Sequence, residues 1–114
     1  MTTEEYYQMT AKELGLKTRM SAWPEKSGQL CYYPNPDNLL YYIPWHPDED
    51  ANQMLMVWDQ LKEQGCKIEI HINKVLYTCE IVQPNMIFFY ADGKSLFTAT
   101  QKAFEAYIGE KNHV

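Results

Sequence analysis

One group of residues in this chain has the types that bind phosphate. Asp92, Gly93, Lys94 and Ser95 match the end of a phosphate-binding loop. That loop also needs a glycine at position 88, where this chain has Phe88, so the pattern predicts a turn with Ser95 as the N-cap of a helix. Lys94 and the free backbone amides after Ser95 could still hold a phosphate group, because a helix N-terminus attracts anions.

A second group has the types that bind metal ions. His46 is followed by Asp48, Glu49 and Asp50. Their spacing matches no known metal site, and acidic residues are ordinary where a helix begins. We therefore predict no metal ion at this segment.

Catalytic residues would have to come from two predicted strands. Cys79 needs a base beside it to act as a nucleophile, and strand alternation places the candidate base His71 on the opposite face. Glu69 and Glu80 could converge on the face that carries His71, but beside Lys67 they are typical of an ordinary charged surface. The sequence predicts no catalytic residue and no cofactor, and hence no enzyme.

Residues 16–47 are rich in proline and aromatic side chains. They hold five of the six prolines, which excludes a long helix. The run 39–43 could form a short edge strand, and the remainder is predicted to be an ordered loop. The aromatic residues are Trp23, Tyr32, Tyr33, Tyr41, Tyr42 and Trp45. Adjacent tyrosines of an extended chain cannot both point inward, so this loop is either core cover or a binding surface, and the last five are candidate contact residues.

Three runs in the C-terminal half have the patterns of strands. Residues 66–72 alternate between apolar and polar, and residues 76–82 largely repeat the alternation. A connecting loop of two or four residues brings their apolar faces together. The other face is polar and carries Glu69, His71, Thr78 and Glu80. The third run, 86–91, is apolar at every position, which predicts a strand that is central or covered on both faces.

Three helices accompany these strands. The first covers residues 1–15 and begins with a capping box, the second covers 49–64, and the third covers 95–108. The expected buried side of the second helix holds Ala51, Leu55, Trp58 and Leu61, joined by Met54 and Val57. We predict that Trp58 packs this helix onto the sheet.

Together these elements predict an α+β fold in a single domain, residues 1–114. Its parts are an N-terminal helix (1–15), a proline- and aromatic-rich loop (16–47) and an αβββα core (48–109). The three strands form an antiparallel meander flanked by helices. We expect helices on one face of this sheet and the N-terminal segment over part of the other face.

Composition narrows the classes of function. A chain of 114 residues that is 46% hydrophobic can build one core, and no apolar run is long enough to cross a membrane. The net charge of −5 argues against DNA or RNA binding, which needs a basic stripe. The acidic N-terminus lacks the apolar segment of a signal peptide, and three cysteines without a close pair favour free thiols in a reducing cytoplasm.

Several positions also match a family pattern. They are Trp45-x-Pro47, Asp50-Ala51-Asn52-Gln53, Trp58, Gly65, Cys79, Ala99 and Ala103-Phe104-x-x-Tyr107, with a first helix that ends in Leu14-Gly15-Leu16. In these residues the stretch from Tyr42 to Tyr107 resembles the phage ABA sandwich domain, a family of small proteins of tailed phages and prophages. The resemblance implies a sheet with helical or loop layers on both sides and a phage genome as the source, and it implies no common activity.

Two functions follow as hypotheses. The first is a non-enzymatic phage accessory protein that binds a protein of the host bacterium stoichiometrically, in order to counter a host defence system. The second is an oligomeric sponge that sequesters a nucleotide second messenger, with tyrosines or Trp45 stacked on bases and Lys94 and Ser95 at the phosphate. Both place the protein in the cytoplasm of the host bacterium. An exposed sheet edge also predicts a homodimer or a larger closed oligomer.

Overall fold

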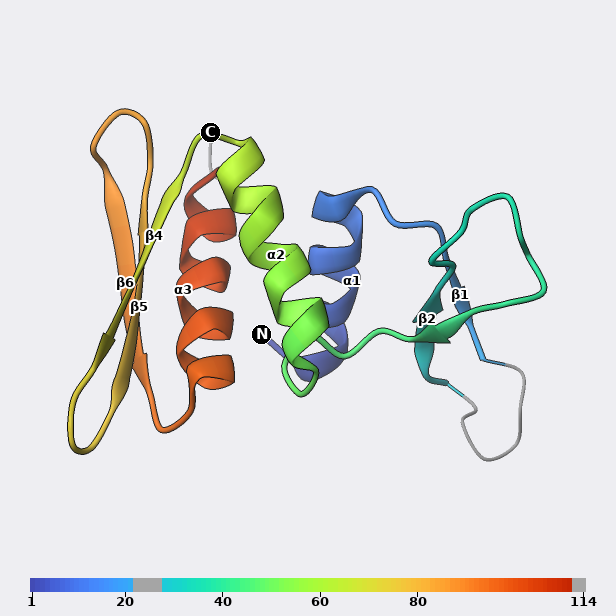
Figure 1. The fold of residues 1–114 in the computed structure, drawn as a ribbon, viewed down its shortest axis with the longest axis horizontal. Helices are drawn as coiled ribbons and strands as arrows, with labels where there is room; N and C mark the ends of the chain where they lie inside the picture. The colour runs from blue at the N-terminus through green and yellow to red at the C-terminus, as the bar shows by residue number, and fades with distance from the viewer. Residues whose placement is uncertain (22–27, 112–114) are drawn as a thin grey trace. The chain divides into compact units, whose positions relative to one another are not determined.

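The computed structural model describes residues 1–21 and 28–111, and it divides into two compact units (Figure 1). Unit 1 is Met1–His46 and unit 2 is Pro47–Val114. The described residues form three helices and two antiparallel three-stranded sheets, which confirms the α+β class. Trp23 lies outside the described residues.

Unit 1 combines one helix with a small sheet. The helix α1 covers Thr3–Leu14. The strands are β1 (Thr18–Met20), β2 (Leu30–Tyr32) and β3 (Ile43–Pro44), paired in that order. α1 packs on β2, so the helix and the sheet share one core.

This small sheet corrects the prediction of an ordered loop at residues 16–47. Its strands have three, three and two residues, which is too short for an alternating pattern to stand out in the sequence. The predicted edge strand at residues 39–43 is also wrong. Residues 39 and 40 form a turn, and β3 begins only at Ile43.

The ends of α1 follow the signals in the sequence. Thr2 is the N-cap, and its Oγ1 accepts a hydrogen bond of 3.2 Å from the backbone amide of Glu5. Gly15 ends the helix at φ +67°, a left-handed conformation that glycine adopts without strain. The buried residues Tyr6, Thr10 and Ala11 form its inner side.

Unit 2 is an antiparallel meander with helices on one face. Its elements are α2 (Ala51–Glu63), β4 (Lys67–Ile72), β5 (Tyr77–Val82), β6 (Phe88–Gly93) and α3 (Leu96–Lys111). The strand order is β4-β5-β6. α3 packs on β5 and β6, and α2 contacts both β4 and α3 (Figure 1). The strand order and the antiparallel pairing match the predicted meander.

The register of β4 and β5 places the side chains on the predicted faces. Ile70 pairs with Cys79 and His71 pairs with Thr78, which leaves a four-residue loop between the strands. Cys79 and Ile81 are buried. The apolar faces of the two strands therefore coincide as the alternation predicted.

The position of β6 is a correction. We expected this apolar strand to be central or covered on both faces, but it is an edge strand. Phe88 is 55% and Tyr90 is 64% exposed. The prediction failed because the hydrophobicity of a strand does not show which strands or helices lie beside it. We call this side of the sheet the open face; it carries Lys67, Glu69, His71, Thr78, Glu80, Phe88 and Tyr90. We expected the N-terminal segment to cover part of this face. Because these aromatic side chains are exposed, they do not support that expectation.

The buried side of α2 agrees only in part with the predicted one. Met54, Val57 and Leu61 are buried, whereas Leu55 is exposed. Trp58 is half-buried, and its Nε1 donates a hydrogen bond of 3.3 Å to Thr100 Oγ1 on α3. Apolar residues cover a wide part of the surface of α2, so periodicity alone did not show which of them are buried.

Candidate functional site

Two of the predicted contact residues lie in the core of unit 1. Tyr32 is 7% exposed and Trp45 is fully buried. Their rings meet edge to face with centroids 5.2 Å apart, and Trp45 Nε1 donates a hydrogen bond of 2.9 Å to Thr10 Oγ1. A buried ring has no face open to a ligand, so Tyr32 and Trp45 are core residues rather than contact residues.

The second pair of aromatic rings in unit 1 lies beside two cations. The rings of Tyr33 and Tyr42 have centroids 6.0 Å apart. Lys17 Nζ lies 6.0 Å from the centroid of Tyr33, and Arg19 Cζ lies 4.6 Å from the centroid of Tyr42. We call these four residues the cation–tyrosine cluster. It combines positive charge with aromatic surface, the two features that a nucleotide would need.

Sequence reasoning missed Lys17 and Arg19 as candidate site residues. Both alternate with uncharged residues, and a period of two places them on one side of an extended chain. Two charged residues do not establish a pattern in so short a stretch, and β1 has only three residues, so no strand was predicted here. The sequence therefore predicted Lys94, rather than Lys17 or Arg19, as the cation that could bind a phosphate.

Hydrogen bonds order the turn that joins β2 to β3. Asn35 Oδ1 accepts from the backbone amide of Asp37 at 3.0 Å. Asn38 Oδ1 accepts from the backbone amide of Leu40 at 3.1 Å. The Asn38 amide also donates to the Asn35 carbonyl at 3.0 Å. Side chains of asparagine often fix turns in this way, so the backbone here has a defined conformation.

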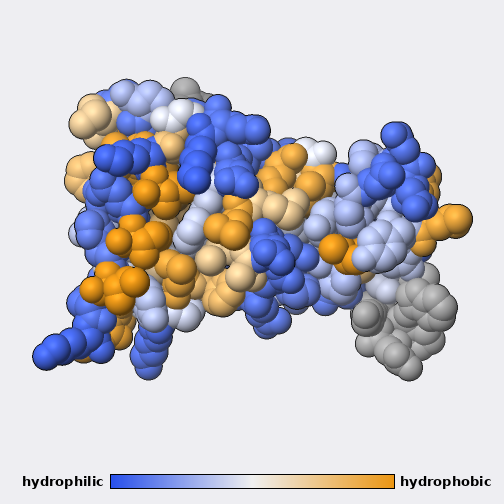
Figure 2. Space-filling model, viewed as in Figure 1, coloured by the Kyte–Doolittle hydropathy of each residue, from blue (hydrophilic) through white to orange (hydrophobic). Residues whose placement is uncertain are grey.

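This turn carries an exposed apolar tip, which we define as Leu39, Leu40 and Tyr41. Their side chains are 51%, 95% and 58% exposed. Figure 2 shows hydrophobic side chains projecting from this part of the β2–β3 connection, at the right edge of the view. Tyr41 was a predicted contact residue. The two leucines were missed, because residues 39–43 were interpreted as a strand.

Lys94 and Ser95 belong to unit 2, where they join β6 to α3. Ser95 Oγ accepts a hydrogen bond of 3.1 Å from the backbone amide of Thr98 and lies 3.0 Å from Thr98 Oγ1. The packing also explains why Gly93, the residue before Lys94, is a glycine. A Cβ atom at Gly93 would come within 2.6 Å of the backbone nitrogen of Ala99, so the close approach of β6 to α3 requires glycine. Ser95 is the predicted N-cap, and Lys94 is exposed.

The open face holds a group that could ligate a metal ion. Ligand atoms of Glu69, His71 and Glu80 lie within 4.8 Å of one another, which confirms that the two carboxylates converge. His71 Nε2 lies 3.4 Å from Glu80 Oε2 and 3.8 Å from Glu69 Oε2. Lys67 Nζ already pairs with Glu69 Oε1 at 3.1 Å. The ion pair of Lys67 with Glu69 within β4, and the contact of His71 with Glu80 across to β5, account for this arrangement, so we assign no metal to it.

The Cys79 thiol is unsuited to nucleophilic chemistry. Burial raises the pKa of this thiol from 9.0 to about 11, and a hydrogen bond with the Thr100 side chain opposes the rise. A thiol with a raised pKa stays protonated at neutral pH and reacts poorly. His71 lies on the opposite side of the sheet, as the register requires. No base therefore serves Cys79 from that strand.

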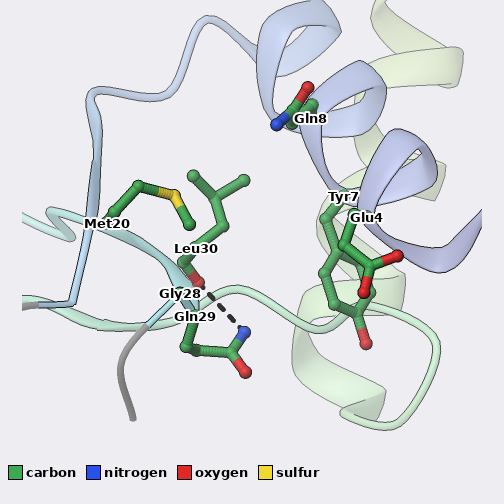
Figure 3. Close-up of a pocket in the computed structure, with 7 residues that line it drawn as sticks. All are labelled: Glu4, Tyr7, Gln8, Met20, Gly28, Gln29 and Leu30. Carbon is green, nitrogen blue, oxygen red and sulfur yellow. Dashed lines mark hydrogen bonds between the residues drawn. The ribbon is translucent and has the colours of Figure 1, made fainter. Parts of the chain in front are cut away.

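A small pocket lies in the described part of unit 1 (Figure 3). It is lined by Glu4, Tyr7, Gln8, Met20, Gly28, Gln29 and Leu30. Gln29 Nε2 donates to the carbonyl of Leu30 at 3.2 Å. The pocket has a volume of about 80 Å³, whereas pockets for small molecules usually have roughly 300–1,000 Å³. A nucleotide would not fit into it.

A wider hollow lies on the open face of unit 2. Its volume is about 540 Å³, and Lys67, Glu80, Met86 and Phe88 are among the residues that line it. The surface there mixes charged and apolar groups, as the rim and centre of a protein interface do. The open face is therefore a second surface available for contacts.

No described helix is long and apolar enough to cross a membrane. The chain was also compared with family models, with curated proteins and with solved structures. None of these comparisons found a match, so the resemblance to the phage ABA sandwich domain rests on the residues quoted above and on no further finding.

Proposed function

We propose that this protein is a non-enzymatic binding protein that acts stoichiometrically on a protein of a host bacterium through its apolar tip. One observation carries the proposal. Leu40 is 95% exposed and stands between two further exposed apolar side chains, Leu39 and Tyr41. Apolar side chains that a fold holds out in water in this way are typical of contact residues.

The energetics of such a contact are favourable. Burial of a leucine side chain contributes about 1.5–3 kcal/mol, and tyrosine is frequent among the residues that dominate interfaces. The hydrogen bonds of Asn35 and Asn38 already order the turn. Binding therefore loses little conformational entropy.

The neighbouring charges indicate what the partner surface looks like. Tyr42 follows the apolar tip and has Arg19 over its ring, while the whole chain carries a net charge of −5. A local cation on an acidic protein favours a partner with an apolar pocket and acidic groups at its rim.

The cellular setting is part of the proposal. The resemblance implies a phage protein, and a small binding protein fits the task of blocking a host defence system in the bacterial cytoplasm. The support for this setting is the resemblance alone, whereas the support for the binding surface is the exposed apolar tip.

The proposal is tested by capture from a bacterial lysate with the tagged protein and two variants. Leu40→Ser removes the centre of the apolar tip. Leu55→Ser is the matched control, since Leu55 is also an exposed leucine but lies on α2. We expect the wild type and the control to recover one host protein in stoichiometric amount, and Leu40→Ser to lose it. Recovery that Leu40→Ser leaves unchanged, or no specific recovery at all, would contradict the proposal.

The cation–tyrosine cluster favours a second candidate function, the sequestration of a nucleotide second messenger. Arg19 and Lys17 would meet the phosphate, and Tyr33 and Tyr42 would stack on a base. In this candidate function Lys17 and Arg19 bind the phosphate, a role that the sequence suggested for Lys94 and Ser95. In this reading oligomerisation completes the pocket.

Thermal unfolding with a panel of cyclic nucleotides tests this second candidate. A ligand at a hundredfold excess over its dissociation constant stabilises the folded state by about 2.7 kcal/mol. We expect Arg19→Gln to abolish the stabilisation and Lys94→Gln to leave it unchanged. A melting temperature that no nucleotide raises, or a shift that depends on Lys94 alone, would remove the cation–tyrosine cluster from consideration.

A further inference from the structure

The sheet of unit 2 has one protected edge and one unprotected edge. Its edge strands are β4 and β6. β4 carries the charged residues Lys67 and Glu69, which discourage pairing with another strand. β6 has no charged residue from Phe88 to Ala91. From Phe88 to Ala91, before Asp92, the edge at β6 therefore lacks the charges that protect edge strands.

The backbone of β6 presents hydrogen-bonding groups along this edge. Just before the strand, the amide of Gln83 donates to the carbonyl of Ile87 at 2.8 Å, which marks these residues as a hydrogen-bonded pair. Such pairs alternate along antiparallel strands, so every second residue after Ile87 bonds to β5. The backbone groups of Phe88, Tyr90 and Asp92 then point away from β5.

We infer that two copies of this chain form a two-fold dimer in which β6 pairs antiparallel with β6 of the second copy, centred on Phe89. Phe88 of each copy lies opposite Tyr90 of the other. Both residues present outward backbone groups, so these are hydrogen-bonded pairs. Both side chains lie on the open face, where they form aromatic pairs across the new strand boundary.

The side chains of β6 favour this register and a second copy as the occupant. Phe88 and Tyr90 are exposed, and their ring centroids lie 6.4 Å apart. Pairing about Phe89 brings four such rings together and removes them from water. A register centred on Tyr90 would instead place Asp92 opposite Phe88, against an apolar ring. The run Phe88-Phe89-Tyr90 is thus complementary to itself, as a two-fold interface requires.

The helices are compatible with this pairing. A two-fold axis perpendicular to the sheet keeps the helices of both copies on the same face. Because α3 packs on β5 and β6, the two α3 helices lie side by side above one continuous sheet of six strands. The inference does not depend on the proposed function, since the apolar tip belongs to unit 1.

The mass in solution tests the dimer. Light scattering across a dilution series is expected to show a species of twice 13.4 kDa for the wild type. Tyr90→Lys places a charge on the edge and should raise the dissociation constant at least about tenfold, in line with the use of lysine on natural edges. Ile72→Lys is the control, because it adds the same charge to an exposed apolar position on β4. A single species of 13.4 kDa at all concentrations, or a dimer that Tyr90→Lys leaves intact, would overturn the inference.

Disulfide formation tests the register. Chains with Phe88→Cys and chains with Tyr90→Cys are mixed and oxidised gently, and the three native cysteines are buried. We expect the mixture to cross-link more than either variant alone, because the two introduced thiols face each other only in the mixed dimer. Cross-linking by Tyr90→Cys alone that matches or exceeds the mixture would overturn the pairing about Phe89.

Discussion

Trp45 and Tyr41 are aromatic residues of one short segment, yet the structure gives them different roles. Trp45 is fully buried with its indole bonded to Thr10, whereas Tyr41 is exposed. We expect Trp45→Ala to cost about 3–5 kcal/mol of unfolding free energy, because it leaves a large cavity. Tyr41→Ala should change it by less than about 0.5 kcal/mol. Denaturation midpoints of the two variants check this, and equal midpoints would show that Trp45 does not support the core.

The Cys79 thiol should make stability fall at high pH. Its pKa is raised from 9.0 to about 11, so the folded chain keeps a proton that the unfolded chain releases between these values. The unfolded state then binds fewer protons, and the free energy of unfolding decreases as pH rises from about 9 to about 11. A pKa difference of about two corresponds to at most about 2.7 kcal/mol.

Urea unfolding as a function of pH measures this effect. Cys79→Ala is the comparison, because the tyrosines and lysines that also titrate in this range are the same in both proteins. We expect the wild type to lose more stability than Cys79→Ala between pH 9 and pH 11, the limits set by the Cys79 pKa. Parallel curves for the two proteins would show that the thiol carries no such linkage.

At the residue scale, the sequence could predict on which side of the sheet a residue lies, but not whether its side chain is exposed to solvent. Strict alternation placed Glu69 and His71 on one side of the sheet, and the register agrees. The same reasoning said that adjacent tyrosines must differ in direction, and Tyr32 is indeed buried while Tyr33 is half-buried. Which tyrosine points inward depends on the pairing of β2, and this pairing joins segments that are distant in the chain.

At the scale of elements, the junction of β6 and α3 depends on glycine. A Cβ at Gly93 would meet the backbone of Ala99 and Thr98 at 2.6 and 3.0 Å. Gly93→Ala should therefore destabilise the fold by about 1–3 kcal/mol, since neither backbone atom can move aside cheaply. Gly109→Ala is a matched control within α3. It meets nothing within 4 Å and should stabilise the helix by roughly 0.5–1 kcal/mol.

Thermal unfolding of both glycine variants separates these expectations. The melting temperature should fall for Gly93→Ala and rise for Gly109→Ala. A Gly93→Ala protein as stable as the wild type would mean that β6 and α3 do not approach closely, and the packing of unit 2 would have to be revised.

The starts of helices were predicted best from the sequence, because their signals are local. The predicted end of the last helix is wrong, since α3 continues through Gly109 to Lys111. Thr2 and Ser95 cap helices as predicted, because each accepts a hydrogen bond from the backbone amide of the third residue after it. Asp50 caps α2 in the same way, although that helix was expected to begin at Glu49. The strands of unit 1 were missed, since two or three residues carry no periodic signal. The edge position of β6 was missed for a different reason: strand order depends on pairing, and the composition of a strand does not contain it.

At the scale of the whole molecule, the structure raises the question of whether its two units unfold together. Each has its own helix and sheet, so we expect a change inside unit 1 to loosen unit 1 first. Thr10→Val keeps the shape of the side chain but removes the acceptor of the Trp45 indole. A buried N–H without a partner costs about 1–3 kcal/mol.

Hydrogen exchange of the Thr10→Val protein provides the measurement. Amides of α1 and β2 should lose protection, whereas those of β5 should exchange as in the wild type, because β5 belongs to unit 2. Val57→Ala in the core of α2 is the reciprocal control, since Val57 is fully buried in unit 2. It should weaken protection of unit 2 and leave the Trp45 indole N–H protected. Equal loss of protection throughout both units in either variant would show that the chain unfolds as one cooperative body, and each unit would then depend on the other for its stability.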